Sequence, residues 1–489
     1  MDNLKIIFTA SELNPIAKVG GLADVIGALP KALHQLGLDV RIVIPKYGVI
    51  KEEEYPSKKV AAGVKVPFNG EEKTIDIYET PLPNTDIPVY MIDNLEYLGQ
   101  NGIYFETDAS SSGSNREAER YSFFARALME IFEPLDWYPN VIHCHDWHVG
   151  FVPVMLKVMA KQNEKLKDIR SLFTIHNLEY QGRYDKEMIF QALGLKEDDY
   201  PTLSETQNGQ INSLQQAILT SDHLNTVSPN YAEEILTSEF GAGLEKVLAT
   251  RQEDLDGILN GLDVDRFDPS QDKNIGQQYS PDDISGKKEC KADLQQKCGL
   301  PINPEIPIMG IVSRLADQKG IDLIHAIADD LAKENMQFVC LGTGDPKLES
   351  MMKEISEKYP DKFYANISFD AAFAQQIYAG SDMFLMPSKF EPCGLGQMIS
   401  MRYGTLPIVR ATGGLKDTVK NIDVVTGQGD GFVFENYDAK EFLESCKHGL
   451  NLYQDTEKWY DVVKRVMAKD FTWDNSAKKY INLYKKILK

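Results

Sequence analysis

The sequence predicts an α/β protein made of two doubly wound domains, each built around a parallel sheet. Short β-branched stretches alternate with helical stretches from end to end, and a chain of 489 residues is too long for one ordinary core. The strand-like stretches also fall into two series. The first series is Lys5–Ala10, Val40–Pro45, Val141–His145, Ser171–His176 and Leu224–Ser228. The second is Ile308–Arg314, Gln337–Gly342, Tyr364–Phe369, Met383–Pro387 and Leu406–Arg410.

Helical periodicity fills the segments between these strands, as in Leu22–Leu36 and Asp322–Lys333. A polar stretch, Val247–Leu259, separates the two series and marks the expected boundary. We therefore predict an N-terminal domain over residues 1–250, a C-terminal domain over 251–470 and a last helix over 471–489. Folds of this class bind ligands at the carboxyl ends of their strands, so functional residues are expected there.

Composition narrows the possible partners. The chain carries 73 acidic and 52 basic residues, a net charge of −21, which disfavours nucleic acid and anionic membranes. The N-terminus lacks the pattern of a signal peptide, and the six cysteines are scattered without a CxxC pair. These features predict a soluble, cytoplasmic protein with free thiols, although Cys290 and Cys298 could lie near each other.

The first candidate motif is Lys18-Val19-Gly20-Gly21-Leu22, between the first strand and the first helix. Adjacent glycines let the backbone approach a ligand, and amides at a helix N-terminus attract anions, to which Lys18 adds a positive charge. Neither the Walker pattern nor GxGxxG is present. Taken alone, such a turn is more often structural, because glycine is the usual residue of tight turns.

The second motif follows the opening strand of the second series and contains Arg314 and Lys319. Arginine can bind a phosphate through two nitrogens and lysine supplies a compact charge, so the pair could hold a diphosphate. Any two cations could equally belong to a solvated loop. Their position at the carboxyl end of a strand favours the ligand-binding interpretation.

The third motif, Lys389–Gln397, follows the strand Met383–Pro387 and leads into a helix. Glu391 can accept hydrogen bonds from sugar hydroxyls, and the amides of Gly394–Gly396 can face a phosphate, although a glutamate before proline could be a turn residue. Downstream, Gly413 and Gly414 repeat the arrangement of strand, Gly-Gly turn and helix. Three such arrangements in one chain are difficult to attribute to chance.

Together these motifs resemble glycosyltransferase family 5, the glycogen and starch synthases. The resemblance covers about Ile7 to Val419 and follows the family's order. It is carried by Lys18–Leu22, His145-Asp146-Trp147-His148, Thr174-Ile175-His176-Asn177, Arg314–Gly320, Phe390–Leu395 and Gly404–Thr418. It implies the GT-B architecture, in which two Rossmann-like domains face a deep cleft and the last helix returns to the first domain.

The resemblance also implies roles for individual residues. The catalytic set is His176 beside the anomeric carbon, Arg314 and Lys319 on the donor diphosphate, and Glu391 on the glucose hydroxyls. The donor-binding set is Lys18, Gly20, Gly21, Asp24, Cys393, Gly394, Leu395, Gly413 and Gly414. The acceptor-side set is Asp146, Trp147, His148 and Asn177.

Two positions depart from patterns seen in relatives. Related nucleotide-sugar transferases carry a second glutamate eight residues after the first, where this chain has Ile399. Family 5 commonly lacks that acid, so the departure leaves the ribose contact unassigned without weakening the expected activity. Gly396 stands where some relatives have a hydroxyl residue, so one phosphate contact is expected from backbone alone.

Other kinds of site are less well supported by the sequence. His143, His145, Asp146 and His148 resemble a metal cluster, but no further ligands with suitable spacing follow, and the family is metal-independent. No pair of carboxylates indicates a glycosidase. No lysine context suggests pyridoxal phosphate, as a phosphorylase would need, and no cofactor is expected.

Aromatic residues offer possible sugar platforms. Phe123 and Phe124 are predicted to lie in the core because they belong to a helical apolar pattern. Tyr97 and Tyr104 are the better candidates for stacking on glucose rings, although tyrosines pack in cores just as readily.

By resemblance, the expected reaction is retaining transfer of glucose from ADP-glucose to an α-1,4-glucan. The expected mechanism is a front-face displacement in which Arg314 and Lys319 neutralise the leaving diphosphate. Two alternatives stay open: a UDP-glucose-dependent transferase of the same fold, and a non-catalytic glucan-binding scaffold. The intact Lys18, Arg314, Lys319 and Glu391 count against the scaffold.

Overall fold

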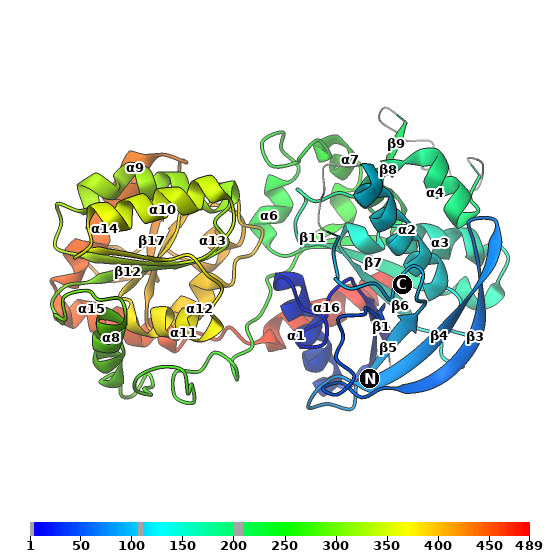
Figure 1. The fold of residues 1–489 in the computed structure, drawn as a ribbon, viewed down its shortest axis with the longest axis horizontal. Helices are drawn as coiled ribbons and strands as arrows, with labels where there is room; N and C mark the ends of the chain where they lie inside the picture. Colours follow the sequence, from blue (N-terminus) through cyan, green and yellow to red (C-terminus); the bar gives the residue numbers. More distant parts are fainter. Residues whose placement is uncertain (1–3, 106–110, 197, 199–208) are drawn as a thin grey trace. The chain divides into compact units, whose positions relative to one another are not determined.

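The computed structural model describes residues 4–105, 111–196, 198 and 209–489. The chain forms two compact units (Figure 1). Unit 1 comprises residues 1–227, 232–261 and 473–489, and unit 2 comprises residues 228–231 and 262–472. Two α/β units with the predicted strand series confirm the fold class, whereas the division predicted at residues 250 and 470 stays a prediction.

Unit 1 is built on a nine-stranded sheet with the order β11-β10-β7-β6-β1-β2-β5-β4-β3. Every neighbouring pair from β11 to β5 is parallel, while β4 runs antiparallel to both β5 and β3. The strands are β1 (Lys5–Thr9), β2 (Asp39–Pro45), β3 (Lys58–Phe68), β4 (Glu71–Pro81), β5 (Pro88–Asp93), β6 (Val141–His145), β7 (Arg170–Ile175), β10 (His223–Thr226) and β11 (Leu255–Gly257). A separate two-stranded sheet pairs β8 (Arg183–Asp185) with β9 (Gln210–Asn212).

The antiparallel edge corrects the prediction of a wholly parallel first sheet. Strands β3 and β4 form a hairpin whose turn, Asn69-Gly70, has positive φ angles of 54° and 75°, as such turns require. Most of β3 is exposed and only its end is buried, so it lacks the continuous apolar run typical of a buried parallel strand.

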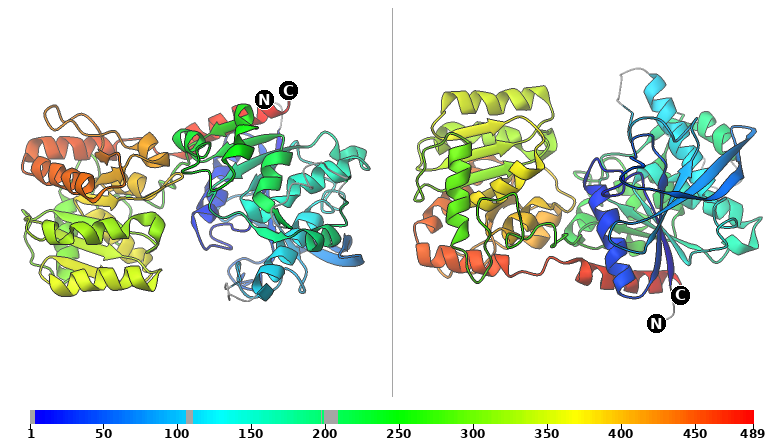
Figure 2. Two further views of the ribbon diagram at one scale, coloured as in Figure 1. Left: turned by 90° about the horizontal axis from the view of Figure 1, so that it is seen from above. Right: turned by 60° about the horizontal axis from the view of Figure 1, so that its bottom comes forward.

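The helices of unit 1 include the C-terminal segment of the chain. They are α1 (Gly21–Gln35), α2 (Ser111–Leu128), α3 (Phe151–Ala160), α4 (Lys186–Leu193), α5 (Ser213–Thr220), α7 (Glu245–Ala249) and α16 (Trp473–Ile487), with α6 (Pro229–Glu234) containing residues of both units. Helix α16 runs beside α1 (Figure 2), and its buried face joins the same apolar core as β1 and α1. The last helix thus packs among elements from the beginning of the chain.

Unit 2 has a six-stranded, entirely parallel sheet with the order β14-β13-β12-β15-β16-β17. The strands are β12 (Ile308–Val312), β13 (Gln337–Leu341), β14 (Phe363–Asn366), β15 (Met383–Met386), β16 (Leu406–Arg410) and β17 (Phe432–Phe434). Because β13 and β15 lie on opposite sides of β12, the strand order reverses between β12 and β15. Such a reversal point is where open α/β sheets bind ligands.

Helices cover both faces of this sheet. Helices α9 (Ile321–Leu331), α10 (Pro346–Lys358) and α14 (Ala439–Tyr453) lie over one face, while α8 (Gly286–Lys297), α11 (Ala371–Gly380) and α12 (Gly396–Arg402) lie over the other (Figure 1). The remaining helices are α13 (Gly413–Thr418) and α15 (Thr456–Met467). Coverage on both sides explains why the strands are almost fully buried, as their unbroken apolar sequences predicted.

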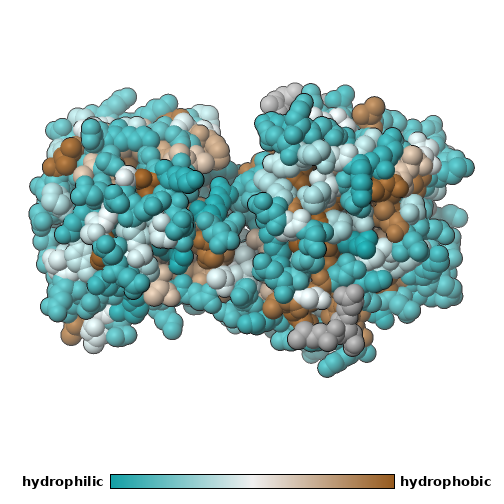
Figure 3. Space-filling view, turned by 90° about the horizontal axis from the view of Figure 1, so that it is seen from below, coloured by the Kyte–Doolittle hydropathy of each residue, from teal (hydrophilic) through white to brown (hydrophobic). Residues whose placement is uncertain are grey.

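The surface is largely polar on the face drawn in Figure 3, as expected for a chain of charge −21. Among the described helices, none is both long and apolar enough to cross a membrane. All six cysteines are free thiols and buried, which confirms the expectation from their spacing.

Candidate active site

The point of strand-order reversal in unit 2 carries a close pair of charged side chains. Lys319 ends a short 3-10 turn after β12, and Glu391 lies in the loop after β15. The Lys319 ammonium donates a hydrogen bond to Oε2 of Glu391 over 2.7 Å. The structure therefore brings together two of the four residues predicted to be catalytic.

Glu391 is almost entirely inside the protein, with 6 % of the residue exposed. Its Oε2 also accepts a hydrogen bond from the Ser388 hydroxyl over 3.0 Å. The two loops are tied by backbone, since the amide of Lys389 donates to the carbonyl of Gln318 over 2.9 Å. A buried carboxylate needs such partners, because an unpaired charge is costly in the interior.

The predicted glycines at 413 and 414 support this loop sterically. Gly413 has a positive φ of 44°, and a Cβ placed there would lie 2.0 Å from the carbonyl oxygen of Glu391. A Cβ on Gly414 would lie 2.1 Å from the carbonyl of Cys393. The start of α13 thus packs directly against the backbone of the Glu391 loop, and only glycine permits that approach.

The other predicted residues of unit 2 lie on the same loops. Gly394 has a positive φ of 72°, Cys393 is buried and Leu395 precedes the first turn of α12. Arg314 is exposed on the loop after β12, and its guanidinium has no ion-pair partner among the described residues. An exposed guanidinium at the carboxyl end of a strand is suited to binding an anionic group of a ligand.

In unit 1, the loop between β1 and α1 is organised by Glu12, which the sequence analysis did not select. Glu12 is buried, and its Oε2 accepts hydrogen bonds from the amides of Val19 (2.8 Å) and Gly20 (2.6 Å). The hydroxyl of Tyr104 donates to its other oxygen. The anion at this helix N-terminus is therefore the protein's own carboxylate, which uses the Gly20 amide predicted to face a ligand.

Lys18, Gly21 and Asp24 stand around the same helix start. The Lys18 ammonium lies 2.5 Å from Oδ1 of Asp24, which also accepts from the side chain of Asn14 over 3.1 Å. A Cβ on Gly21 would meet nothing within 4 Å. Packing therefore does not require glycine at this position, which leaves close approach of a ligand as a physical reason for it.

Asp146 connects the ends of β6 and β7. Its Oδ1 accepts a hydrogen bond from the backbone amide of His176 over 2.7 Å, and the amide of Asn177 also points to its carboxylate. Burial raises the pKa of Asp146 to about 7, and these two amide hydrogen bonds limit the rise. Desolvation lowers the pKa of His176 to about 3, so its imidazole is neutral.

Aromatic rings surround His148, another of the predicted acceptor-side residues. Its ring stacks on Trp147, with centroids 3.9 Å apart, and on Tyr104 at 5.1 Å. Burial lowers the pKa of His148 to about 3. The rings of Trp147, His148 and Tyr104 thus form an uncharged aromatic cluster.

The prediction that Tyr97 offers a platform for sugars is wrong. Tyr97 is 8 % exposed and its ring stacks on Phe123, with centroids 4.6 Å apart, while Phe68 packs edge-on at 5.1 Å. It belongs to the core between β3 and α2. Phe123 and Phe124 are buried as predicted.

The histidines considered as metal ligands have other partners. His143 bonds Tyr484 and Thr174, and His145 bonds His176. Within the described part of the chain, no group of three potential ligands is placed to hold a metal ion. That no metal takes part stays a prediction.

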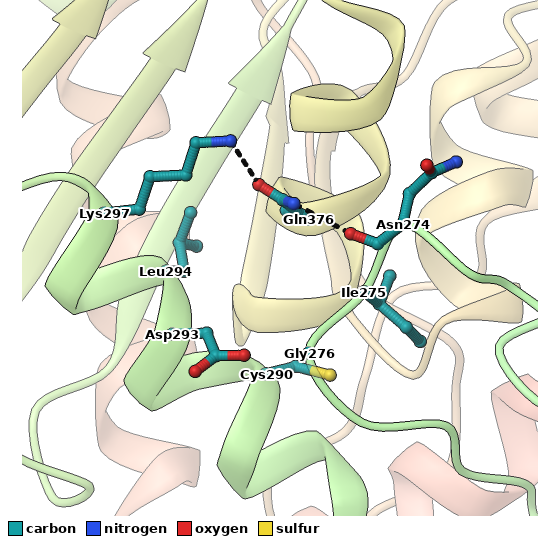
Figure 4. A pocket seen from close by; sticks show the side chains of 8 residues that line it. All are labelled: Asn274, Ile275, Gly276, Cys290, Asp293, Leu294, Lys297 and Gln376. Carbon is teal, nitrogen blue, oxygen red and sulfur yellow. Dashed lines mark hydrogen bonds between the residues drawn. The ribbon is translucent and has the colours of Figure 1, made fainter.

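A cavity of about 240 Å³ in unit 2 lies outside the predicted site and shares no residue with it (Figure 4). Its polar groups already bond one another: Lys297 donates to Gln376 over 2.7 Å, and Gln376 donates to the carbonyl of Asn274 over 2.8 Å. The lining is Asn274, Ile275, Gly276, Cys290, Asp293, Leu294, Lys297 and Gln376.

Phe369 is an exposed aromatic residue of unit 2 that was not among the predicted site residues. It follows β14 at the carboxyl edge of the unit 2 sheet, and 89 % of it is exposed. An aromatic residue at the end of a predicted strand is a signal that could have been noticed, because the sequence places Phe369 at that edge. For Glu12 the only signal was its position two residues after the first predicted strand.

Comparison with known proteins agrees with this arrangement. Residues 5–250 match the family model described as the starch synthase catalytic domain, and residues 295–464 match glycosyl transferases group 1. The chain is 42 % identical to the glycogen synthase of Clostridium novyi over 486 residues, covering 99 % of both chains. The glycogen synthase of Thermotoga maritima is also 42 % identical over 99 % of both chains.

Solved structures give the same relationship. The catalytic domain of starch synthase IV from Arabidopsis thaliana, bound to ADP and acarbose, superposes with a TM-score of 0.89 at 34 % identity and full coverage of both chains. A sucrose-phosphate synthase from Thermosynechococcus elongatus shares the fold, with a TM-score of 0.60 at 18 % identity over 99 % of both chains. With relatives this similar along its whole length, the chain belongs to the glycogen and starch synthase family of glycosyltransferases.

Proposed function

We propose that this enzyme transfers glucose from ADP-glucose to the non-reducing end of an α-1,4-glucan, with retention of configuration at the anomeric carbon. The observation that carries the proposal is the Lys319–Glu391 pair at the strand-order reversal of unit 2. The similarity to glycogen synthases, and the ADP and acarbose bound to the starch synthase IV domain, support the choice of donor and acceptor.

The pair suits a nucleotide-sugar because its two members bind different parts of it. Lys319 and the exposed Arg314 supply positive charge for a diphosphate, and Glu391 supplies carboxylate oxygens that accept hydrogen bonds from sugar hydroxyls. Glu391 is fixed by Ser388 and by the close-packed Gly413, so its carboxylate is oriented before a ligand arrives. Preorganised groups of this kind lose little free energy to reorganisation during the reaction.

The transfer itself breaks the bond between the anomeric carbon and the phosphate oxygen and forms a bond to the acceptor's 4-hydroxyl oxygen. The acceptor's proton passes to the departing phosphate oxygen, so the products are ADP and a glucan longer by one residue. Arg314 and Lys319 stabilise the negative charge that grows on the diphosphate. No carboxylate is needed as a nucleophile, in keeping with the use of Glu391 as a sugar ligand.

Residues of unit 1 are proposed to act on the same reaction. Lys18 and Gly21 contact the donor, Asp146 and Asn177 contact the acceptor side, and neutral His176 lies at the reacting sugar. The neutral imidazole is supported by its lowered pKa, since a neutral ring can donate a hydrogen bond without opposing the positive charge of an oxocarbenium-like transition state.

Phe369 is proposed to stack on the donor base. Its exposed ring follows β14, on the same sheet edge as the Lys319 loop. Stacking is tolerant of base identity because every base has an aromatic face, so this contact supports affinity more than the choice of adenine over uracil.

The test is a direct assay of the purified protein with ADP-glucose or UDP-glucose and glycogen, in which nucleotide release and chain lengthening are measured. ADP release matched by chain lengthening is the expected result. UDP release alone would show that the donor is UDP-glucose and not ADP-glucose. If neither donor released its nucleotide, the protein would be interpreted as a non-catalytic glucan-binding scaffold. A cytoplasmic location is part of the proposal, supported by six free thiols, which suit a reducing compartment.

A further inference from the structure

Three histidines of unit 1, His143, His145 and His176, form a row of neighbouring side chains. His143 and His145 point to the same face of β6, and their ring centroids are 4.0 Å apart. Phe8 of β1 stacks on His145 from the neighbouring strand, with centroids 5.4 Å apart and rings nearly parallel. At the upper end, Nδ1 of His145 lies 2.9 Å from Nε2 of His176.

The lower end of the row is held by the C-terminal helix. The hydroxyl of Tyr484, on α16, lies 2.8 Å from Nδ1 of His143, and Thr174 Oγ1 lies 2.7 Å from the other ring nitrogen. Tyr484 and His143 are fully buried. Both nitrogens of His143 are therefore bonded, and its ring is fixed against the ring of His145.

The direction of the upper hydrogen bond follows from what surrounds His145. Burial lowers the pKa values of both His145 and His176, so each ring is neutral and carries a single N–H. The Nε2 atom of His145 is buried and has no hydrogen-bond partner among the described residues. A proton there would leave a buried donor unpaired, whereas a proton on Nδ1 is used by His176 and leaves only a lone pair unpaired.

We propose that His145 is a positioning residue for the transfer reaction: it donates its Nδ1 hydrogen to Nε2 of His176 and so keeps the His176 proton on Nδ1. Tyr484 supports this arrangement from α16 by fixing the ring of His143, which packs against the His145 ring in a tilted arrangement with centroids 4.0 Å apart. The significance for catalysis rests on the role proposed above for His176. The consequence is that the His176 nitrogen left for a ligand is a hydrogen-bond donor.

The first test reads the tautomer directly. Full-length protein labelled with ¹⁵N in its histidine rings is examined by NMR near pH 7, and the His176 signals are assigned by their loss in His176→Gln. The expected result is a protonated Nδ1 and an unprotonated Nε2 on His176. A proton on Nε2 of His176 would overturn the proposal, whatever the activity of any variant.

The second test uses a conservative rescue. Asparagine can place an amide donor near the position of Nδ1, whereas leucine cannot. His145→Leu is expected to lower kcat by about tenfold, the value of one lost hydrogen bond in the transition state, with an unchanged KM for the donor. His145→Asn should recover most of that loss, and equal kcat values for the two variants would contradict a positioning role.

The third test separates the Tyr484 hydroxyl from the general stability of α16. Tyr484→Phe is expected to lower kcat by about threefold to tenfold. Ala477→Gly, a buried position on the same helix, weakens the helix without removing a polar group and should leave kcat unchanged. If both variants lowered kcat equally, the support from α16 would be disproved.

The inference and the proposed function can fail separately. Normal turnover in His176→Ala would refute the catalytic role of His176 while leaving the measured tautomer as it is. If His145→Leu failed to fold, the NMR measurement of the His176 tautomer in the unaltered protein would still decide whether His145 donates to His176.

Discussion

The ammonium of Lys319 bonds the carboxylate of Glu391 over 2.7 Å, although the two residues are 72 positions apart in the chain. They meet because β15 lies directly beside β12 in the sheet, on the side opposite β13. Parallel strands end at one edge, so loops from distant parts of the sequence become neighbours there. The pair is thus a direct product of the order of the strands.

Lys319→Met removes the ammonium and leaves the buried Glu391 carboxylate with fewer partners. We expect kcat/KM to fall by about 10²–10³-fold, the usual effect of losing one preorganised electrostatic group. The free energy of unfolding should fall by about 1–3 kcal/mol because Glu391 loses its charged partner. Steady-state kinetics and urea unfolding measure the two effects.

Lys389→Met is the matched control. Lys389 lies in the same loop as Glu391, but its ammonium pairs with Asp317 over 3.3 Å at the surface. Exposed pairs contribute at most about 1 kcal/mol, so this variant should keep near-normal activity and stability. Equal losses in the two variants would show that any cation in this loop serves, against the specific role of Lys319.

Glu12→Gln tests the carboxylate that holds the loop before α1. The glutamine side chain has one oxygen that accepts hydrogen bonds and one NH2 group that does not. The three bonds donated by Val19, Gly20 and Tyr104, which use both oxygens of Glu12, therefore cannot all persist. We expect the free energy of unfolding to fall by about 2–3 kcal/mol, since these bonds are made to a charged group. Tyr104→Phe removes the bond to Glu12 and the longer contact of 3.2 Å with the Ser11 hydroxyl, and should cost only about 1–2 kcal/mol. A double-mutant cycle of the two changes, read by thermal unfolding, should give a clear coupling energy, and simple additivity would count against the shared bond.

Gly413→Ala tests the steric support of the Glu391 loop. The methyl group would lie 2.0 Å from the Glu391 carbonyl oxygen, so the loop must move, and the KM for the donor should rise at least tenfold. The matched control is Gly427→Ala, where φ is also positive, at 70°, but a Cβ would meet nothing within 4 Å. That variant should show only the backbone cost of about 1–2 kcal/mol and an unchanged KM. A normal KM in Gly413→Ala would show that the close packing of Gly413 does not hold the Glu391 loop in place.

Asp146→Asn tests the raised pKa of a buried carboxyl. In the unfolded chain this carboxyl loses its proton near pH 3.8, whereas in the folded protein it keeps the proton until about pH 7. Between these values the folded state binds more protons, so rising pH lowers its stability. Asparagine keeps the oxygen for the His176 amide and tolerates the positive φ of 61°, but it cannot ionise.

The stability of Asp146→Asn relative to the original protein should therefore increase from pH 4 to pH 7, by on the order of 4 kcal/mol at most. The difference between the two proteins must be used, because buried neutral histidines such as His148 act in the opposite sense. Their lowered pKa values make them stabilising above about pH 6.5, and that contribution is lost as the pH falls. A difference that does not change with pH would contradict the raised pKa.

Phe369→Ala tests the exposed ring at the end of β14. Stability should be unchanged because 89 % of the residue is already in water. The KM for ADP-glucose should rise by about 5–100-fold, the range expected for losing one stacked base. Val425→Ala, another exposed apolar residue of unit 2, is the control and should leave the KM unchanged. A normal KM in Phe369→Ala would exclude base stacking at this residue.

Most of the parallel strands were predictable because they are buried on both faces and read as short apolar runs, but the parallel strands β5, β11 and β17 were not predicted. The predicted strand Ile308–Arg314 and the strands beside it in the sheet, β13 and β15, match the structure within one or two residues, whereas Tyr364–Phe369 ends three residues beyond β14. The β3–β4 hairpin was missed because β3 is mostly exposed and shows no such run. Edge strands of this kind are defined by their pairing, which local sequence does not display.

The site was predictable where a motif follows a buried strand, as for Lys319 and Glu391. Glu12 was missed because a glutamate in a loop is ordinarily solvated, and only the fold shows that it is buried against two backbone amides. Tyr97 was misjudged for the converse reason. Its partners Phe68 and Phe123 come from β3 and α2, so the sequence around Tyr97 does not reveal that its ring is enclosed.

The membership of α16 in unit 1 has a consequence for how the protein is made. The core of unit 1 contains Trp473, Tyr480 and Tyr484 together with residues of β1 and α1, so part of this core is synthesised only after residues 262–472 of unit 2. The hydroxyl of Ser476 donates a hydrogen bond to the carbonyl of Leu259. Trp473 packs so closely on Gly261 that a Cβ at Gly261 would lie 2.7 Å from it, so α16 covers this part of the core. A fragment ending at residue 261 would expose that core, whereas unit 2 is complete before residue 473 is added. During synthesis, unit 1 can therefore complete its core only after all of unit 2 has been made.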